Sequence, residues 1–250
     1  MASTEPTPPE SRAGDEPSRA KVAAIIPAHN ESATIAGVVE VACSSRYVDE
    51  VIVVDSVSTD DTAKLAGEAG ATVVVSDVPG KGEAMAAGVA ATDAEIILFL
   101  DADLLNLTVQ HVDRLVRTVT EEGAAMSCGL FDRGPLLNTI FLNFLPILTG
   151  ERAVRREVFE SLEPDDVEGY RIEAALNSRV GELQLKRVCF VCAGLWHLTK
   201  EKKYANPVEG FLRKTLMLMT AIWEYVSYRL RRRTFRRAAL ARNRPDSGAA

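Results

Sequence analysis

Two carboxylates, Asp101 and Asp103, are the residues of this chain best suited to do chemistry. They flank Ala102 and directly follow Glu95–Leu100, an apolar run typical of a buried strand. Two carboxylates two residues apart at a strand end can converge on one cation, and Mg²⁺ and Mn²⁺ prefer oxygen ligands. Because a short Asp-x-Asp pattern also occurs by chance in loops, its meaning depends on the residues that accompany it.

Other candidate binding residues follow the other apolar runs in the first half of the chain. They are Pro27, Ala28, Asn30 and Glu31 at the end of the first run, Asp55 and Ser56 at the end of the second, and Gly80 and Lys81 beyond the third. Ligands of open α/β sheets bind beyond the carboxyl ends of the strands. We therefore expect these side chains to gather at one edge of the sheet with Asp101 and Asp103.

The elements that must position these residues alternate between strand and helix patterns. Strands are predicted at 22–27, 51–55, 71–75 and 95–100. Helix-capping side chains are expected from Asn30, Glu31 and Ser32, and later from Thr59, Asp60 and Asp61. Runs that are apolar throughout indicate a sheet covered on both faces. The predicted class is α/β, with a Rossmann-like, mostly parallel sheet and helices on both faces.

The second half of the chain has a different pattern. It predicts strands at 124–131 and 186–193, a helix that starts at Glu173, and a helical region over 207–244. We expect a disordered tail at 1–20, one α/β domain over 21–206, a basic amphipathic helical extension at 207–245 and a disordered end at 246–250. Neither a signal peptide nor an apolar run of about 18 residues is visible, so the cytoplasm is the expected compartment.

Charge and cysteine content narrow the functional classes. The formal net charge is −6, but residues 207–250 hold ten Lys/Arg and only three Asp/Glu. An acidic body argues against nucleic acid as a partner. The basic segment, and the apolar run 136–148, are compatible with peripheral contact at an anionic inner membrane face, or with ordinary packing. Cys189 and Cys192 lie three residues apart in a predicted strand, which disfavours a shared disulfide or metal.

Four segments occur in an order and at a spacing that resemble the family 2 glycosyltransferases, which have the GT-A fold. They are Pro27-Ala28-His29-Asn30-Glu31, Asp55-Ser56-x-Ser58-Thr59-Asp60-Asp61-Thr62, Gly80-Lys81-Gly82-Glu83-Ala84 and Asp101-Ala102-Asp103. Within that family the chain looks most similar to the glucosyl-3-phosphoglycerate synthase type and to polyprenyl-phosphate sugar synthases. The resemblance covers about residues 22–203.

The resemblance implies roles for individual residues. Pro27, Ala28 and Glu31 would line the nucleoside pocket together with Asn30 and Ser56, and Asp55 would bind the base. Gly80 and Lys81 would lie near the nucleotide phosphates, where a cation is favourable. Asp101 would contact the ribose or the metal, and Ala102 beside it would contribute to substrate binding. Asp103 would bind the metal directly.

Three further residues each allow more than one role. His197 resembles the position of a third metal ligand, but a single histidine near a strand end is also often structural. Glu151 and Glu173 are the candidate catalytic carboxylates, since an inverting enzyme needs a base against the acceptor hydroxyl. A retaining enzyme can work without one, so the stereochemical outcome stays open.

The expected function is that of a glycosyltransferase dependent on Mg²⁺ or Mn²⁺. It would move sugar from a UDP- or GDP-sugar to a small phosphorylated acceptor. The alternatives are a polyprenyl-phosphate acceptor and, from another class, a sugar-phosphate nucleotidyltransferase. The nucleotidyltransferases usually have a glycine-rich loop after the first strand, where this chain has Pro27-Ala28-His29-Asn30-Glu31.

Overall fold

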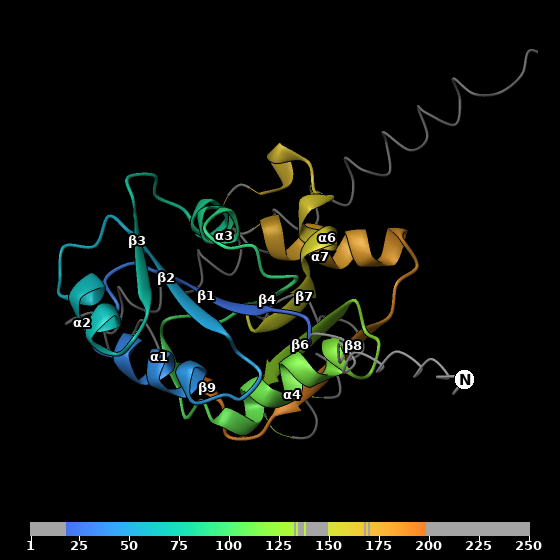
Figure 1. The fold of residues 1–250 in the computed structure, drawn as a ribbon, viewed down its shortest axis with the longest axis horizontal. Coiled ribbons are helices and arrows are strands. Elements are labelled where there is room, and N and C mark those ends of the chain that lie inside the picture. Colours follow the sequence, from blue (N-terminus) through green and yellow to red (C-terminus); the bar gives the residue numbers. More distant parts are fainter. Residues whose placement is uncertain are drawn as a thin grey trace, which may run out of the picture.

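A computed structural model describes residues 19–132, 134, 138, 150–167, 169 and 171–198. Its centre is a seven-stranded mixed sheet in the order β3-β2-β1-β4-β7-β6-β8, and a two-stranded ribbon, β5-β9, accompanies it. The strands β3, β2, β1 and β4 run parallel, β6 and β8 run parallel, and β7 is antiparallel to both neighbours. The predicted α/β class with a mostly parallel sheet is therefore confirmed (Figure 1).

Each predicted strand is present, and the structure adds three short strands, β5, β7 and β9, that the sequence analysis does not predict. The strands are β1 Val22–Ala28, β2 Glu50–Ser56, β3 Thr72–Ser76, β4 Ile96–Phe99, β5 Leu104–Leu105, β6 Met126–Phe131, β7 Arg152–Arg155, β8 Arg187–Cys192 and β9 Trp196–His197. The helices are α1 Ile35–Cys43, α2 Thr62–Glu68, α3 Lys81–Ala90, α4 Val109–Thr120, α6 Arg156–Glu160, η1 Pro164–Asp166 and α7 Arg171–Glu182.

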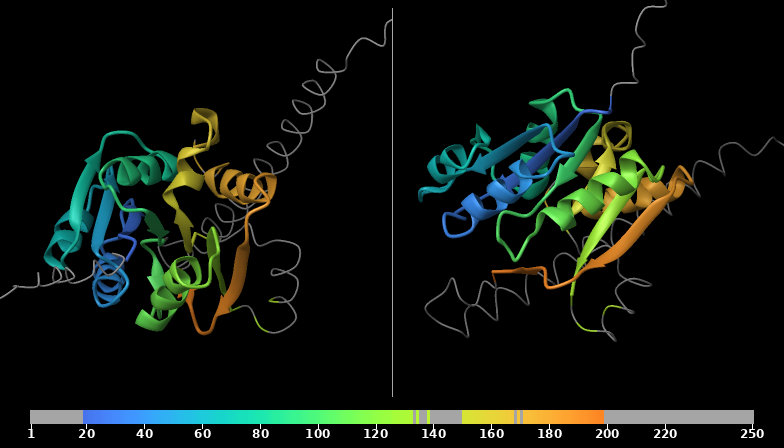
Figure 2. Two further views of the ribbon diagram at one scale, coloured as in Figure 1. Left: turned by 45° about the vertical axis from the view of Figure 1, so that its right-hand side comes forward. Right: turned by 60° about the horizontal axis from the view of Figure 1, so that its bottom comes forward.

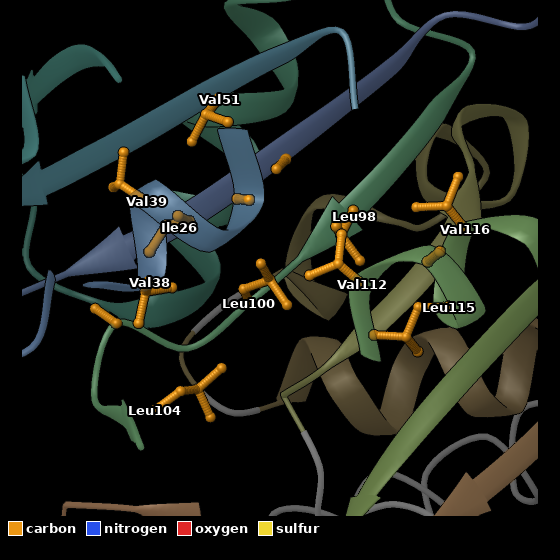
Figure 3. Close-up of a cluster of buried hydrophobic side chains, with 14 of the residues drawn as sticks. Ile26, Val38, Val39, Val51, Leu98, Leu100, Leu104, Val112, Leu115 and Val116 are labelled. Carbon is orange, nitrogen blue, oxygen red and sulfur yellow. The ribbon is translucent and has the colours of Figure 1, made fainter. Parts of the chain in front are cut away.

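Helices cover both faces of the sheet, and each face has its own apolar core. On one face, α1, α2 and α4 pack against the sheet around Ile26, Leu98 and Leu115 (Figure 3). On the other face, α3, α6 and α7 enclose Ile25 and Phe99 (Figure 1). Because successive strand residues point to opposite faces, neighbours such as Ile25 and Ile26 serve different cores. This explains why the strand sequences are apolar throughout.

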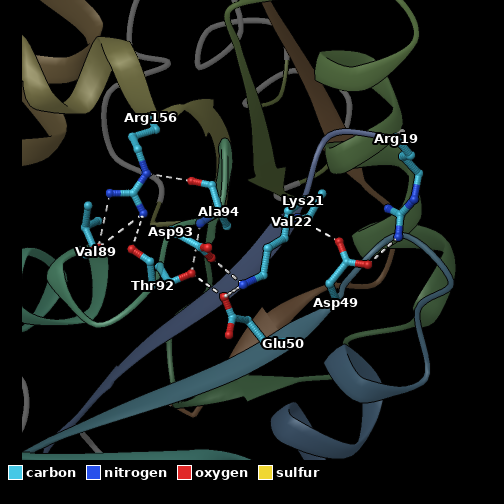
Figure 4. Close-up of polar contacts among 10 residues, drawn as sticks. All are labelled: Arg19, Lys21, Val22, Asp49, Glu50, Val89, Thr92, Asp93, Ala94 and Arg156. Carbon is cyan, nitrogen blue, oxygen red and sulfur yellow. Dashed lines mark hydrogen bonds and ion pairs between the residues drawn. The ribbon is translucent and has the colours of Figure 1, made fainter. Parts of the chain in front are cut away.

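The end of the sheet where the strands begin is closed by polar contacts (Figure 4). Lys21 pairs with Glu50 and Asp93, and Asp49 accepts a hydrogen bond from the backbone N–H of Val22. The Arg156 guanidinium donates to the carbonyl oxygens of Val89, Thr92 and Ala94. These contacts satisfy charges and carbonyls at that end, and they lie at the opposite end of the strands from the candidate binding residues.

The prediction of capping residues is wrong for α1, whereas the predicted start of α2 at Asp60 and Asp61 is confirmed. Thr34, not Asn30, Glu31 or Ser32, is the N-cap residue of α1, and it makes no side-chain capping bond. Asn30 instead adopts φ 54°, a left-handed conformation. Asp61 occupies the N-cap of α2 without a side-chain bond, whereas the Asp60 carboxylate accepts from the backbone N–H of Thr62. Several hydrogen bonds of these two loops therefore connect one loop with the other and do not cap the helix that follows.

The predicted geometry of the two cysteines of β8 holds. Cys192 lies in the core cluster on the α1 and α4 side, whereas Cys189 packs against the cluster on the α3 and α7 side. The expected N-terminal tail up to residue 18, the apolar run 136–148 and the basic region 207–244 lie outside the described residues, apart from Asn138. No helix in the described ranges has the length and apolarity that a membrane crossing requires.

The close packing of α3 on β1 leads to a test of stability. A Cβ at Gly88 would lie 2.4 Å from Cγ2 of Ile25, so Gly88→Ala should destabilise the fold by about 1–3 kcal/mol. The matched control is Gly37 in α1, where a Cβ would meet nothing within 4 Å. Gly37→Ala should stabilise by about 0.5–1 kcal/mol through helix propensity. Urea unfolding would measure both, and equal effects at the two positions would contradict this packing.

Candidate donor and metal site

The loops that follow β1 and β2 are joined by hydrogen bonds. The backbone N–H of Asn30 donates to Oγ of Ser58 at 2.9 Å, and the backbone N–H of Thr59 donates to Oδ1 of Asn30 at 2.8 Å. The backbone N–H of Glu31 donates to Oγ1 of Thr62 at 2.8 Å. The left-handed backbone of Asn30 thus turns its side chain toward the other loop, and the two loops form one rigid rim.

His29 and Asp55 fix the base of this rim. Nδ1 of His29 lies 2.6 Å from the carbonyl oxygen of Ser56, so Nδ1 carries the proton. Its Nε2 then accepts from Nδ2 of Asn30 at 3.1 Å. Asp55 is 6% exposed, and its Oδ1 accepts from the Ser58 hydroxyl. The neighbouring β1 strand ends beside it, with Ala28 in register with Asp55.

Lys81 links the two halves of the sheet edge. Its ammonium lies 2.7 Å from Oδ1 of Asp101, at the end of β4, and 2.7 Å from Oε1 of Glu173 in α7. Gly80, with φ 138°, precedes Lys81 at the N-terminus of α3. Burial lowers the pKa of Lys81, but the Asp101 and Glu173 carboxylates outweigh it, so the net pKa is raised. The ammonium is therefore charged at neutral pH.

Arg152 of β7 extends this chain of charges into the core. Its side chain is fully buried, with Nη2 3.7 Å from Oε2 of Glu173 and Nη1 donating to the carbonyl oxygen of Glu173 at 3.2 Å. A buried guanidinium needs such partners, because an uncompensated charge in the interior is strongly unfavourable. Glu173 is thus held from two sides, by Lys81 and by Arg152.

The backbone before β7 lies directly against the Asp101 carboxylate. A Cβ at Gly150 would lie 2.3 Å from Oδ1 of Asp101, a distance that real Cβ atoms do not adopt. Only glycine lets the chain approach so closely. The segment that precedes β7 therefore contacts the loop that follows β4 at this point.

Asp103 directly precedes β5 of the small ribbon, and His197 lies on its partner strand β9. Leu104 pairs with His197, and the backbone N–H of Leu198 donates to the carbonyl oxygen of Asp103 at 2.8 Å. The His197 ring contacts Phe131 and Trp196, and its Nδ1 is buried without a hydrogen-bond partner in the described structure. A carboxylate and an imidazole with an unused nitrogen are suitable donors for Mn²⁺.

The described residues contain no group of three or more His, Cys, Asp or Glu side chains that could hold a metal ion. Asp101, Asp103 and His197 are therefore not assembled as a three-ligand site here, and the Asp101 carboxylate is turned toward Lys81. Their joint ligation of a metal stays a prediction.

Glu151 and Glu173 lie in different surroundings. Glu151 is fully buried, and its negative charge is among the causes that raise the pKa of the Cys192 thiol to about 12, after burial itself. Such a position favours a structural role for Glu151. Glu173 has a side chain 12% exposed and lies beside Lys81 and Asp101, so it is the carboxylate of the two that adjoins the site.

Arg152, Ser58 and Gly150 are the site residues whose roles sequence reasoning missed. Arg152 was visible only as part of Gly150-Glu151-Arg152. An arginine that opens a strand is usually exposed, and only the tertiary fold shows that this one is buried beside Glu173. The hydroxyl residues after Asp55 were visible as a motif, but their bonds to the other loop depend on the pairing of β1 with β2.

The Lys81–Glu173 pair gives a test of this arrangement. Glu173→Gln removes the charge shared by Lys81 and Arg152 and should destabilise the fold by about 1–3 kcal/mol. Since the raised pKa of Lys81 keeps it protonated, the contribution of the Lys81 pair to this loss should be constant from neutral pH up to its ordinary value of 10.5. Glu68→Gln, which breaks the exposed pair with Lys64, is the control and should cost less than about 1 kcal/mol. Denaturant unfolding at several pH values would measure both.

Solved structures and characterised relatives resemble this chain. Glucosyl-3-phosphoglycerate synthase of Mycobacterium tuberculosis is 42% identical over 95 residues, which are 34% of this chain and 29% of that protein. The synthase of Mycolicibacterium smegmatis is 38% identical over 123 residues, 45% of this chain and 41% of that protein. These alignments thus span less than half of the relatives' length.

The structural match is longer. A crystal structure of the M. tuberculosis synthase with Mn²⁺, UDP-glucose and phosphoglyceric acid has a TM-score of 0.66 and 30% identity, and it covers 83% of this chain and 79% of that chain. The sequence model "Glycosyl transferase family 2" matches residues 23–161, more than half of the chain and all four donor segments. This protein therefore belongs to glycosyl transferase family 2.

Proposed function

We propose that this protein transfers a sugar, in the presence of Mg²⁺ or Mn²⁺, from a UDP-sugar to a small phosphorylated acceptor. The observation that carries the proposal is that polar residues follow three parallel strands at one edge of the sheet, where Lys81 pairs with Asp101. These residues are Asp55 near the end of β2, Lys81 beyond β3, and Asp101 with Asp103 beyond β4. That edge includes the point between β1 and β4 where strand order reverses, which is where open α/β sheets bind nucleotides. The name and bound ligands of the M. tuberculosis relative support the same reaction.

The joined loops after β1 and β2 would hold the nucleoside. Their mutual hydrogen bonds keep Pro27, Ala28, Asn30 and Glu31 in place before the donor arrives, which reduces the entropy lost on binding. Asp55, nearly buried and bonded to Ser58, offers its remaining oxygen as an acceptor for an N–H of the base. Ser56 contributes a buried hydroxyl with no hydrogen-bond partner in the described structure.

Asp103 and His197 would hold the divalent cation, with Asp101 close by. When bound, the metal would neutralise charge on the diphosphate as it leaves. Lys81 adds a second positive charge near the same place, and its present carboxylate partners keep it oriented. Glu173 would face the acceptor side, where it either positions the acceptor or accepts the proton of its hydroxyl.

A polyprenyl-phosphate acceptor is the alternative reading of the same site. The basic region 207–244 motivates it, and that region lies outside the described residues. The small acceptor is preferred because the structurally similar M. tuberculosis enzyme was crystallised with phosphoglyceric acid. We also propose a cytoplasmic location, with peripheral contact at the membrane as part of the lipid alternative.

Metal-dependent nucleotide binding tests the donor half of the proposal. Asp103→Ala should weaken UDP binding in the presence of Mn²⁺ by at least about tenfold, because even the loss of a residue that only supports a metal ligand typically costs that much. UDP binding without metal should change little. Asp93→Ala, an exposed acid at the opposite end of the sheet, is the control. Isothermal titration would measure both, and wild-type affinity in Asp103→Ala would overturn the assignment of the metal site.

The acceptor half needs a separate assay. UDP-glucose should lose UDP when phosphoglyceric acid is added with Mn²⁺, and a mass spectrum should show the glucosylated acceptor. Transfer only to a polyprenyl phosphate in detergent would establish the lipid alternative instead. Release of pyrophosphate from UTP and a sugar phosphate would point to the nucleotidyltransferase class and reject both.

A further inference from the structure

Two cysteines from distant parts of the chain face each other in the second half of the sheet. Strands β6 and β8 run parallel, side by side (Figure 2). Cys128 is in register with Cys189. Both side chains lie on the α3 and α7 side, where Cys128 belongs to the core cluster and Cys189 packs against it. Neighbouring strands lie about 4.7–4.9 Å apart. That spacing falls in the range of Cα separations of about 4.4–6.8 Å that a disulfide accepts.

The two thiols have opposite chemical character. They share a hydrogen bond, which lowers the pKa of Cys189 to about 7 and raises that of Cys128. Burial acts against ionisation of Cys189, but the Arg187 and Arg152 guanidinium groups favour its thiolate. Cys189 is partly exposed and Cys128 is buried. The arrangement is that of an accessible attacking thiol with a second thiol directly behind it.

The other two cysteines lack these features. Cys192 lies on the opposite face of β8, and burial, followed by the Glu151 charge, raises the pKa of its thiol to about 12. Cys43 is exposed at the end of α1, and burial raises the pKa of its thiol as well. The chain therefore contains its own controls for thiol reactivity.

We propose that Cys128 and Cys189 form a dithiol oxidation site that closes to a disulfide between β6 and β8. With a peroxide as oxidant, the Cys189 sulfur attacks one peroxide oxygen, the O–O bond breaks, and one water is released, leaving a sulfenic acid. The Cys128 sulfur then attacks the Cys189 sulfur, and a second water leaves with the sulfenic oxygen and the Cys128 proton. Two thiols lose two electrons, and the peroxide is reduced to two waters.

The position of this pair connects it to the donor site. Arg152 of β7 is in register with Cys128, so the three side chains form one row across β7, β6 and β8. Arg152 also holds Glu173, which pairs with Lys81, which pairs with Asp101. Disulfide formation draws the two sulfur atoms together, and because Arg152 stands next to Cys128 in the same row, this movement shifts the guanidinium relative to Glu173. We therefore expect oxidation to weaken the Arg152–Glu173 contact and, through it, donor binding.

Treatment of the full chain with hydrogen peroxide tests the oxidation site. Peptide mapping without reductant should show Cys128 linked to Cys189, and a thiol reductant should reverse the link. Cys192→Ser and Cys43→Ser should form the link at the wild-type rate, whereas Cys128→Ser and Cys189→Ser should not form it. Absence of the link in wild type, or a link through Cys192 or Cys43, would overturn the proposal.

Folding of the variants must be verified, because Cys128 is buried. Thermal unfolding followed by circular dichroism would do so, and Cys189→Ser, at the less buried position, provides the test if Cys128→Ser does not fold. The coupling is tested by UDP titration with Mn²⁺, in which oxidised wild type should bind several-fold more weakly than reduced protein. Unchanged UDP affinity in protein shown to be cross-linked would reject the coupling. Absence of UDP binding in the reduced protein would instead contradict the proposed donor site, on which the coupling rests.

Discussion

The bridge from Lys81 to Asp101 and Glu173 holds the candidate site together. It joins the N-terminus of α3, the end of β4 and the first turn of α7, and Arg152 extends it to β7. Charges with so little exposure depend on one another for compensation, because each would be strongly destabilised without its partners. The two halves of the domain therefore share an electrostatic link at the edge of the sheet where β4 ends.

The loops after β1 and β2 are held by a different kind of interaction. There, neutral hydrogen bonds join the loops after β1 and β2, and the left-handed backbone of Asn30 directs its side chain across the gap. The proton on Nδ1 of His29 is fixed by the Ser56 carbonyl, so the ring has one defined orientation. Loops fixed in this way can bind a ligand in a single orientation. Cys128 and Cys189 lie on the same sheet, one and two strands beyond Arg152.

Much of the fold was predictable because hydrophobic periodicity reports burial directly. The runs at 22–27 and 51–55 became β1 and β2 with fully covered faces, and their polar ends reached one edge as expected. Capping was predicted less well, since Asn30 can satisfy either a helix end or a neighbouring loop, and local sequence does not decide between them. The opposite orientation of Cys189 and Cys192 followed from strand geometry alone, but the pairing of Cys189 with Cys128 did not.

The sequence by itself determined the class of the fold and the family, because apolar runs and the four donor segments are local patterns. Only the tertiary structure decided which charges meet. Glu173 lies 92 residues from Lys81 along the chain, and Arg152 turned out to be buried beside it. Such contacts depend on strand order and on how closely backbones approach, as at Gly150. These are properties of the whole packed sheet, which no local pattern encodes.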